Sequence, residues 1–346
     1  MRKYEEVKMA FKVVHTIAVP DMPIEEKIIT GIGAQLVRGV FMTEDQIIQA
    51  CKDADAIVCG ATTQPFNRKV IENLPKCRII ANIGIGYDKL DVQAATDHTI
   101  LATNVPDYCL EEVSDQAMAL ILALYRKLFP AAAKSAEGKW LMFPEHSKTL
   151  MPIFRLRGRT LGLLGLGRIG RAMVPKAKGF GMKVIAYDPY IPAKVATDMG
   201  VELVDKDILL AQSDYLSLHA PANPDGTPLM GAKEFKKMKP TAYLINTARG
   251  SLVDEKALIA ALNAKQIAGA GLDVMHGEPP STDNPLFKMP NVIISGHSGQ
   301  LSVEATMELF RRPLQECARV LQGEWPGGLL NPQVKDKFVA RFGAMK

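Results

Sequence analysis

The sequence predicts an α/β protein with two doubly wound parallel sheets. Two series of short apolar runs alternate with stretches whose apolar residues recur at helical spacing, and a long helical segment at residues 111–128 separates the series. Such alternation is typical of parallel sheets covered by helices. The chain has 346 residues, of which 47% are hydrophobic, so it is long enough to form two buried cores.

The apolar runs set the expected order of elements. In the first series we expect strands at 13–19, 56–59 and 78–83, with helices at 44–50 and 68–74 between them. In the second series we expect strands at 160–164, 184–187, 201–204, 215–218, 243–246, 271–274 and 292–295. A helix expected at 303–322 follows the last strand and suggests a return to the first domain. We therefore predict a discontinuous, flavodoxin-like domain at residues 1–106 plus 301–346 and a central domain at residues 107–300.

Composition and charge exclude several classes of protein. The net charge is +5, but basic residues are interspersed with acidic ones, so nucleic acid is not indicated. The most apolar stretch, residues 117–124, is shorter than the roughly 20 residues that a bilayer span needs, and we expect a buried helix there and no membrane partner. Five cysteines without a C-x-x-C pair favour reduced thiols, and charged residues near the N-terminus interrupt any signal-peptide core. We therefore expect a cytoplasmic protein.

The segment 161–170 contains the pattern G-x-G-x-x-G between an expected strand and an expected helix. Gly165 would allow the tight turn, Gly167 would let the backbone approach a pyrophosphate, and Gly170 would allow the helix to pack closely on the strand. The helix N-terminus would offer N–H groups to the phosphates. The pattern alone is a weak signal, but its position between strand and helix predicts that the central domain is a Rossmann dinucleotide-binding domain.

Asp188 follows the next expected strand, roughly 20 residues beyond the glycines. A carboxylate at this point can accept both hydroxyls of the adenosine ribose and would repel the 2′-phosphate of NADP. The alternative is a turn residue before Pro189, which does not explain its distance from the glycine motif. We therefore expect NAD as the cofactor.

Three polar segments follow expected strands, which is where doubly wound folds bind their ligands. They contain Arg249, Glu278 and His297. Reduction of a 2-keto acid needs a cation for the carboxylate, polarisation of the carbonyl and a proton for its oxygen. We predict that Arg249 binds and polarises the substrate, that His297 is the general acid and base, and that Glu278 favours the imidazolium form of His297.

Each of these residues alone has an ordinary explanation, as a surface cation, a solvated turn residue or a loop donor. Their occurrence together behind a dinucleotide motif is what favours catalysis. We expect no metal site, because the other histidines show neither H-x-x-x-H nor H-E-x-x-H spacing. These histidines are His15, His98, His146, His219 and His276.

From about residue 79 to residue 332 the chain resembles the D-isomer-specific 2-hydroxyacid dehydrogenases. It is most similar to the branch that holds phosphoglycerate dehydrogenases and C-terminal-binding proteins. The motifs that carry the resemblance are residues 163–170 with Asp188, then 216–221, 244–254 and 271–279, and finally His297. The resemblance implies an NAD-dependent oxidoreductase with D stereochemistry, a substrate domain built from both chain ends, and a homodimer formed mainly through the NAD domains.

The resemblance also implies roles for individual residues. It places the active-site Arg, Glu and His of the family on Arg249, Glu278 and His297, and it places Asp273 near the nicotinamide carboxamide. The residues implied to contact the cofactor are Gly165, Gly167, Arg168, Ile169, Gly170, Asp188, His219, Pro221, Thr247, Ala248, Arg249, Asp273 and His297.

Residues 82–88 resemble the family loop whose backbone amides hold the substrate carboxylate. Ile85 and Gly86 are therefore candidate substrate-binding residues, together with Arg249 and His297. Glycines after a strand allow N–H groups to converge on an anion. The alternative is an ordinary glycine turn.

Three positions depart from the family pattern. Asn82 stands where several relatives have Arg, which weakens the case for a phosphorylated or dicarboxylic substrate. Gln116 replaces a histidine that is frequent in the family, and Gly296 replaces a proline that often precedes the catalytic histidine. Glu278 disfavours formate oxidation, because those relatives carry Gln there. A dinucleotide-sensing protein that recruits partners is the alternative function, since C-terminal-binding proteins share the fold.

Overall fold

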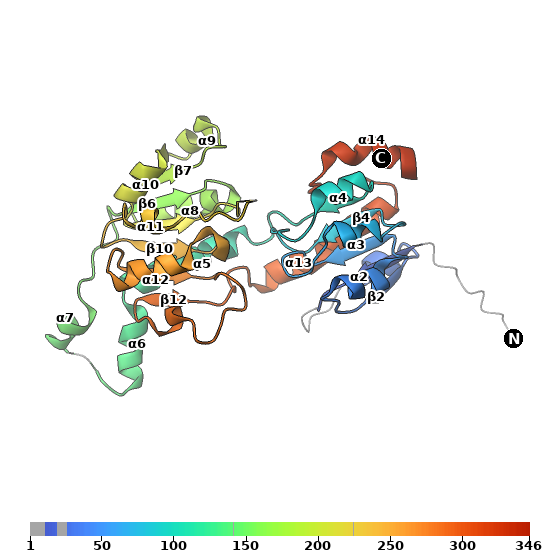
Figure 1. The fold of residues 1–346 in the computed structure, drawn as a ribbon. Helices are drawn as coiled ribbons and strands as arrows, with labels where there is room; N and C mark the ends of the chain where they lie inside the picture. Colours follow the sequence, from blue (N-terminus) through green and yellow to red (C-terminus); the bar gives the residue numbers. More distant parts are fainter. Residues whose placement is uncertain (1–10, 19–25, 141, 224) are drawn as a thin grey trace. The chain divides into compact units, whose positions relative to one another are not determined.

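The computed structural model describes residues 11–18, 26–140, 142–223 and 225–346, and its chain divides into two compact units. The first unit is formed by Met1–Tyr108 and Ser302–Lys346, and the second by Cys109–Leu301. Each unit has its own parallel sheet between helices (Figure 1). The prediction of two doubly wound parallel-sheet units is confirmed.

The first unit is built on a five-stranded sheet with the order β2-β1-β3-β4-β5, which is the flavodoxin-like order. Its strands are β1 (Lys12–His15), β2 (Gln35–Arg38), β3 (Ala56–Cys59), β4 (Ile79–Asn82) and β5 (Leu101–Thr103). Its helices are α1 (Lys27–Thr30), α2 (Glu44–Cys51), α3 (Arg68–Glu72), α4 (Val92–Asp97), α13 (Val303–Leu321) and α14 (Lys335–Phe342), with a 3₁₀ turn, η3, at Pro332–Val334. β1 ends earlier than the strand expected at 13–19, and residue 19 lies outside the described residues.

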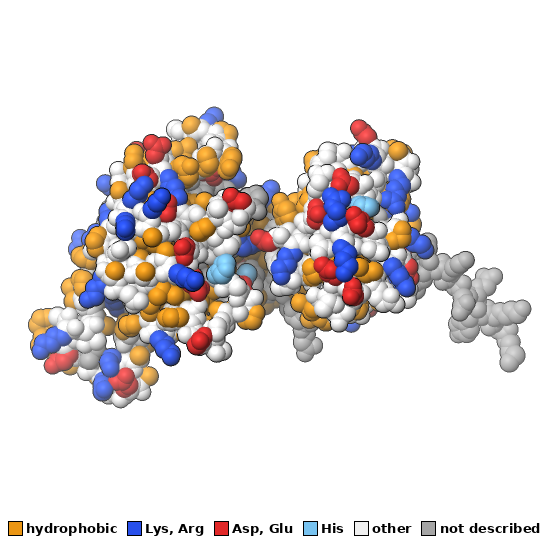
Figure 2. All heavy atoms as spheres, in the orientation of Figure 1, with side chains coloured by type: hydrophobic (Ala, Val, Ile, Leu, Met, Phe, Trp, Pro, Cys, Tyr) orange, Lys and Arg blue, Asp and Glu red, His pale blue; other side chains and the backbone are white. Residues whose placement is uncertain are grey.

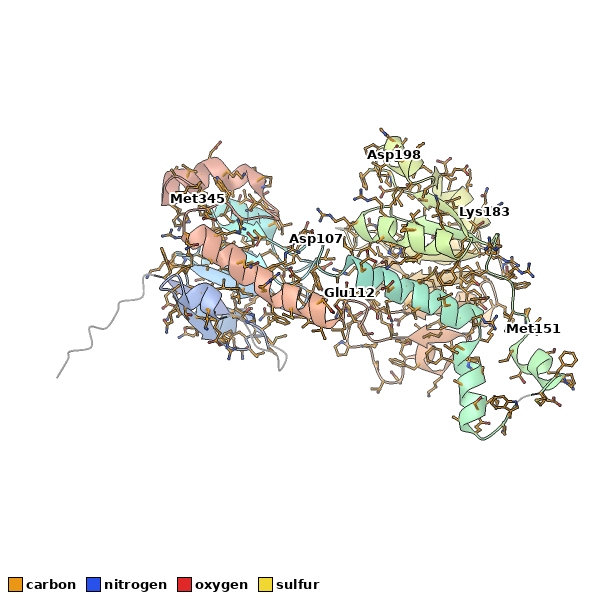
Figure 3. The ribbon with its side chains drawn as sticks, turned by 180° about the vertical axis from the view of Figure 1, so that it is seen from behind. Asp107, Glu112, Met151, Lys183, Asp198 and Met345 are labelled. Atoms are coloured by element: carbon orange, nitrogen blue, oxygen red, sulfur yellow. The ribbon has the colours of Figure 1, made fainter. Side chains whose placement is uncertain are left out.

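The core of the first unit lies on both faces of this sheet. All four residues of β3 are buried, and they alternate between two apolar clusters, Ile57 and Cys59 in one and Ala56 and Val58 in the other. Helix α13, from the C-terminal part of the chain, contacts β3 and β4 on the second of these faces (Figure 3). A central strand buried on both faces reads as a continuous apolar run, which is why it could be predicted.

The second unit is built on a seven-stranded sheet with the order β12-β11-β10-β9-β6-β7-β8, the Rossmann order extended by one strand. Its strands are β6 (Thr160–Leu164), β7 (Lys183–Tyr187), β8 (Glu202–Leu203), β9 (Tyr215–Leu218), β10 (Tyr243–Asn246), β11 (Gly269–Leu272) and β12 (Val292–Ile294). Its helices are α5 (Leu110–Tyr125), α6 (Leu128–Ala136), α7 (Glu145–Leu150), α8 (Arg168–Gly179), α9 (Ala193–Asp198), α10 (Lys206–Gln212), α11 (Ala232–Phe235) and α12 (Glu255–Asn263), with 3₁₀ turns η1 (Gly250–Leu252) and η2 (Pro285–Lys288).

Helix α5 carries the most apolar stretch of the chain and is buried, as expected. Ala117, Leu120 and Ile121 are at most 3% exposed, and the helix packs on α8 and on β10 and β11. None of the helices within the described part of the chain is both long and apolar enough to cross a membrane.

The segment that holds α6 and α7 extends from the rest of the second unit (Figure 1). No residue of α6 is buried, and large apolar side chains of this segment face solvent. Trp140 is 83% exposed and Phe143 is 81% exposed. Contiguous apolar surfaces are typical of sites that bind another molecule.

The buried His15 at the end of β1 predicts a loss of stability in acid. Burial lowers the pKa of His15 to about 4, and Arg38 adds to the shift. The unfolded chain takes up this proton near pH 6.5 and the folded protein does not, so stability is lost as the pH falls from about 6.5 towards about 4. We expect the free energy of unfolding of the first unit to fall by roughly 2 kcal/mol between pH 7 and pH 5, measured by urea unfolding.

A His15→Phe variant is the control for this prediction, because it keeps a ring next to Phe310 without a titratable group. Its unfolding free energy should fall less between the same two pH values. An equal fall in both proteins would assign the acid sensitivity to other groups.

Candidate active site

Two glycines of the G-x-G-x-x-G motif have close contacts with the protein, and the third faces open space. Gly165 has a φ of +99°, and a Cβ at this position would lie 2.7 Å from the backbone of His219. A Cβ at Gly170, in the first turn of α8, would lie 2.3 Å from the carbonyl oxygen of Gly165. Gly167 faces open space, with no heavy atom of the described residues within 4 Å of an added Cβ. The loop is therefore tight on its protein side and open where a pyrophosphate would approach.

Asp188 follows β7 and is tied to the glycine loop. Its Oδ2 accepts a hydrogen bond from the N–H of Leu166 at 2.8 Å, and its Oδ1 accepts one from the N–H of Tyr190 at 2.9 Å. Each carboxylate oxygen keeps a second lone pair. The carboxylate is thus held beside the loop with acceptor capacity left for ribose hydroxyls.

His219 lies on the other side of β6, after β9. The backbone N–H of His219 donates to the carbonyl of Leu164 at 2.8 Å, and the ring Nε2 lies 2.9 Å from the hydroxyl of Ser217. Burial lowers the pKa of the His219 ring to about 4. The ring is therefore neutral at pH 7, beside the turn at Gly165.

The segment after β10 is shaped by Asn246, which the sequence analysis did not single out. This buried carboxamide accepts from the N–H of Ala248 at 3.0 Å and donates to the carbonyl of Arg249 at 2.8 Å. Thr247, between them, is buried, and its hydroxyl has no hydrogen-bond partner among the residues described. An orphaned hydroxyl at this edge fits a site that a ligand completes.

Glu278 and His297 form a hydrogen-bonded pair. The Nδ1 atom of His297 lies 2.5 Å from Oε2 of Glu278, and Oε1 of Glu278 accepts from the N–H of Met275 at 2.9 Å. The side chains are 44% and 35% exposed, respectively, so a substrate can reach the pair. With Nδ1 engaged, Nε2 is the ring nitrogen left for proton transfer.

The loop that carries His297 is held by Asp273. Oδ1 of this buried carboxylate accepts from the hydroxyl of Ser295 at 2.6 Å and from the N–H of Ser298 at 2.9 Å, and Oδ2 accepts from the N–H of Gly299 at 3.0 Å. His297 itself has a φ of +56°, which a non-glycine residue adopts at a cost. The Asp273 contacts therefore fix the loop in a conformation that it would not adopt alone.

The three predicted catalytic residues lie on the loops after the adjacent strands β10, β11 and β12. A Cβ added to Gly250 would lie 1.9 Å from the carbonyl oxygen of Met275, so the segment after Arg249 directly contacts the one that positions Glu278. Arg249 donates from its guanidinium to the carbonyl of Ala248 at 2.7 Å. The implied cofactor contacts occupy the same edge, after β6, β7, β9, β10, β11 and β12.

The remaining candidates, Ile85 and Gly86, lie in the first unit after β4. Both are partly exposed, and no acceptor for their N–H groups occurs among the residues that the structure describes. Two of the positions that depart from the family pattern are placed as follows. Asn82 is fully buried, and Gln116 lies against Gly299 in the loop that Asp273 holds. No cluster of three or more His, Cys, Asp or Glu residues suited to a metal is found in the described ranges.

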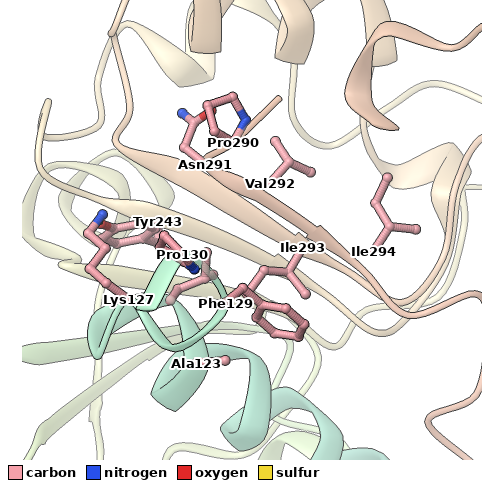
Figure 4. A pocket seen from close by; sticks show the side chains of 11 residues that line it. Ala123, Lys127, Phe129, Pro130, Tyr243, Pro290, Asn291, Val292, Ile293 and Ile294 are labelled. Atoms are coloured by element: carbon pink, nitrogen blue, oxygen red, sulfur yellow. The ribbon is translucent and has the colours of Figure 1, made fainter. Parts of the chain in front are cut away.

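A cavity of about 240 Å³ lies elsewhere in the second unit, between the end of α5, the start of α6 and β12 (Figure 4). Most of its wall is apolar, and Lys127 donates across it to the hydroxyl of Tyr243 at 2.9 Å. It is lined by Ala123, Leu124, Lys127, Phe129, Pro130, Tyr243, Pro290, Asn291, Val292, Ile293 and Ile294. None of the predicted catalytic or cofactor residues is among them.

Comparison with known families agrees with this arrangement. The family model described as "D-isomer specific 2-hydroxyacid dehydrogenase, NAD binding domain" matches residues 118–299. This range contains the glycine motif and all three predicted catalytic residues.

Individual relatives match most of the chain. A glyoxylate reductase of Korarchaeum cryptofilum is 39% identical over 83% of this chain and 86% of its own length. A D-3-phosphoglycerate dehydrogenase of Methanocaldococcus jannaschii is 40% identical over 84% of this chain but only 54% of its own length. The crystal structure of a glyoxylate reductase from Paecilomyes thermophila superimposes with a TM-score of 0.81 and 30% identity, over 93% of this chain and 98% of that one.

Proposed function

The chain belongs to the D-isomer-specific 2-hydroxyacid dehydrogenases, which are NAD-dependent oxidoreductases, and on this premise we propose that it interconverts a small 2-keto acid and its D-2-hydroxy acid. The observation that carries the proposal is the 2.5 Å contact between Nδ1 of His297 and Oε2 of Glu278. Glu278 follows β11, and Arg249 follows the adjacent strand β10. In the pair of His297 and Glu278, His297 is the proposed general acid, and the hydrogen bond to Glu278 orients its ring. Residues 107–300 form the NAD domain in this proposal, and residues 1–106 plus 301–346 form the substrate domain.

A dinucleotide held by the glycine loop and Asp188 would supply or accept the hydride at the 2-carbon. In reduction, imidazolium His297 donates its Nε2 proton to the carbonyl oxygen, which becomes the hydroxyl, and the ring is left neutral. Glu278 accepts a hydrogen bond from Nδ1 throughout and so keeps Nε2 directed at the substrate oxygen. In oxidation, the neutral Nε2 takes the hydroxyl proton back.

We propose that the N–H groups of Ile85 and Gly86 are the carboxylate-binding groups of the first unit and that Arg249 is the substrate-binding cation of the second unit. The Arg249 guanidinium also polarises the carbonyl, because a cation beside that oxygen stabilises the negative charge that develops there. Asn82 brings no positive charge to the loop, and two relatives reported above are named glyoxylate reductases. We infer a small keto acid with a single carboxylate.

The test of this function is NADH oxidation, followed by absorbance, with a panel of 2-keto acids. The panel includes glyoxylate, pyruvate and hydroxypyruvate, with oxaloacetate and phosphohydroxypyruvate as members that carry a second acidic group. Turnover of the small acids with a single carboxylate supports the proposal. Turnover confined to the members with a second acidic group would refute the substrate class, and tight NADH binding without any turnover would favour the partner-recruiting alternative.

Asp188 is expected to set the preference for NAD. An Asp188→Ala change should weaken NADH binding by about 10-fold or more, because charge-assisted hydrogen bonds to the ribose are lost, and should leave NADPH binding equal or stronger. Titration of both cofactors by fluorescence measures the ratio. Equal weakening of both would mean that Asp188 acts only through its bond to Leu166.

We also propose a homodimer formed through the segment of α6 and α7. Its exposed apolar side chains include Trp140 and Phe143. Figure 2 shows apolar side chains on this part of the surface, and the apolar cavity of Figure 4 lies at the base of the segment. A Trp140→Glu, Phe143→Glu double variant is expected to be monomeric by light scattering where the unchanged protein is dimeric. Its control is Tyr190→Glu, which changes an exposed aromatic residue away from this segment. Five free, buried cysteines suit the cytoplasm as the location.

A further inference from the structure

The loop proposed to bind the substrate carboxylate is held by two asparagine side chains. Asn82, the last residue of β4, is fully buried, and its Nδ2 donates to the carbonyl of Gly86 at 2.8 Å and to that of Gly84 at 3.3 Å. Asn104, just after β5, donates from Nδ2 to the carbonyl of Ile85 at 2.8 Å. Three consecutive carbonyls of the loop therefore point towards protein donors.

The direction of these carbonyls decides the direction of the amides. In a planar trans peptide the C=O of one residue and the N–H of the next point to opposite sides. The carbonyl of Gly84 thus sets the N–H of Ile85, and the carbonyl of Ile85 sets the N–H of Gly86. The N–H of Val105 adds a second donor to the carbonyl of Gly84, at 3.1 Å.

Both N–H donors of the Asn82 carboxamide are used by the carbonyls of the loop. The Oδ1 of Asn82 accepts from the N–H of Ala61 at 2.8 Å, which joins the loop after β4 to the loop after β3. A second buried carboxamide, Gln64, accepts there from the N–H of Gly60 at 2.8 Å and donates to the carbonyl of Thr16 at 2.8 Å. The loops after β1, β3 and β4 are therefore linked to one another through side-chain amides.

We propose that Asn82 and Asn104 are positioning residues for the substrate carboxylate, which hold the N–H groups of Ile85 and Gly86 outward as a preformed, uncharged anion site. This inference rests on the proposed function, because it concerns the same substrate. It explains why the position of Asn82 does not need a cation: its side chain acts on the loop and not on the substrate. Because the amides are already fixed, little conformational entropy of the loop is lost when the carboxylate binds.

The test uses Asn82→Asp and Asn104→Asp in the full chain. Each change keeps the size of the side chain and replaces the donor Nδ2 with an oxygen that repels the loop carbonyls. We expect KM for the keto acid to rise about 10-fold in each variant with kcat within about threefold, since the loop contributes binding that the ground state and transition state share. NADH affinity, from fluorescence titration, should not change.

Asn331→Asp is the matched control. Asn331 is also fully buried in the first unit, accepts from the N–H of Ala102 at 2.9 Å and donates to the carbonyl of Ile100 at 2.9 Å, but it does not contact the loop. It should lower the melting temperature without raising KM. An equal rise of KM in this control, or no rise in the two loop variants, would overturn the inference.

Two further outcomes are decisive. If Asn82→Asp does not fold, the partly exposed Asn104 still gives the answer, and an unchanged KM in Asn104→Asp would overturn the proposal. Failure of the unchanged protein to reduce any keto acid would refute the proposed function and the inference together, whereas normal turnover with unaffected KM in the variants would refute the inference alone.

Discussion

Replacing His297 with alanine is expected to lower kcat for keto-acid reduction by roughly 10²- to 10⁴-fold. The change removes the proposed Nε2 proton donor and leaves Glu278 without the partner that it contacts at 2.5 Å. Asp273 holds the loop on both sides of this residue through Ser295, Ser298 and Gly299. Steady-state rates at saturating keto acid, combined with NADH titration, separate lost chemistry from lost cofactor binding.

The control is His276→Ala, which removes an exposed histidine two residues before Glu278. Its kcat should stay near that of the unchanged protein. A His297→Ala enzyme that keeps its rate within a few-fold would show that the proton comes from another group, and the roles given to both members of the pair would have to be withdrawn.

The second large effect is expected from Gly250→Ala. A Cβ at this position would lie 1.9 Å from the carbonyl oxygen of Met275 and 2.5 Å from the N–H nitrogen of His276, and backbone atoms cannot move aside as a flexible side chain does. We expect the second unit to lose roughly 3 kcal/mol of stability or more. Activity should fall as well, because the contact joins the segments of Arg249 and Glu278. Denaturant unfolding and kcat/KM measure the two effects.

Gly179→Ala provides the comparison, since no heavy atom of the described residues lies within 4 Å of its added Cβ. This glycine is the last residue of α8, and alanine there should be tolerated. Similar destabilisation by both substitutions would mean that the close approach at Gly250 is relieved by a small backbone movement.

The interior strands of both sheets could be predicted because a strand that is buried on both faces is a continuous apolar run in the sequence. β3, β6, β9 and β10 occupy the positions expected from apolar runs, since each is an interior strand of its sheet. β2 was not predicted: it is an edge strand with exposed Gln35 and Arg38 at its ends, so its sequence has no apolar run. β5, also at an edge, has only three residues. Short edge strands are formed by pairing with a neighbour, which a single sequence does not display.

The candidate site was predictable where chemistry requires a particular side chain. The glycines, Asp188 and the three catalytic candidates are each proposed to contact a ligand directly, and their residue types indicate such a role. The supporting residues were not predictable as supports. Asn246 reads as an ordinary polar residue at the end of a strand, and Asn82 read as a departure from a cationic position, whereas the structure shows both bonded to the backbone of neighbouring loops.

The two units also divide the proposed tasks between them. Every residue assigned to proton transfer and to the dinucleotide belongs to Cys109–Leu301, whereas the amides assigned to the carboxylate belong to the unit that contains both ends of the chain. Under the proposed function, substitutions in the loops after β1, β3 and β4 change the substrate preference while the proposed proton donor and the dinucleotide loop, which belong to the other unit, keep their residues. Arg249 is the one proposed substrate-binding cation that such substitutions leave in place, so a carboxylate on the substrate remains required.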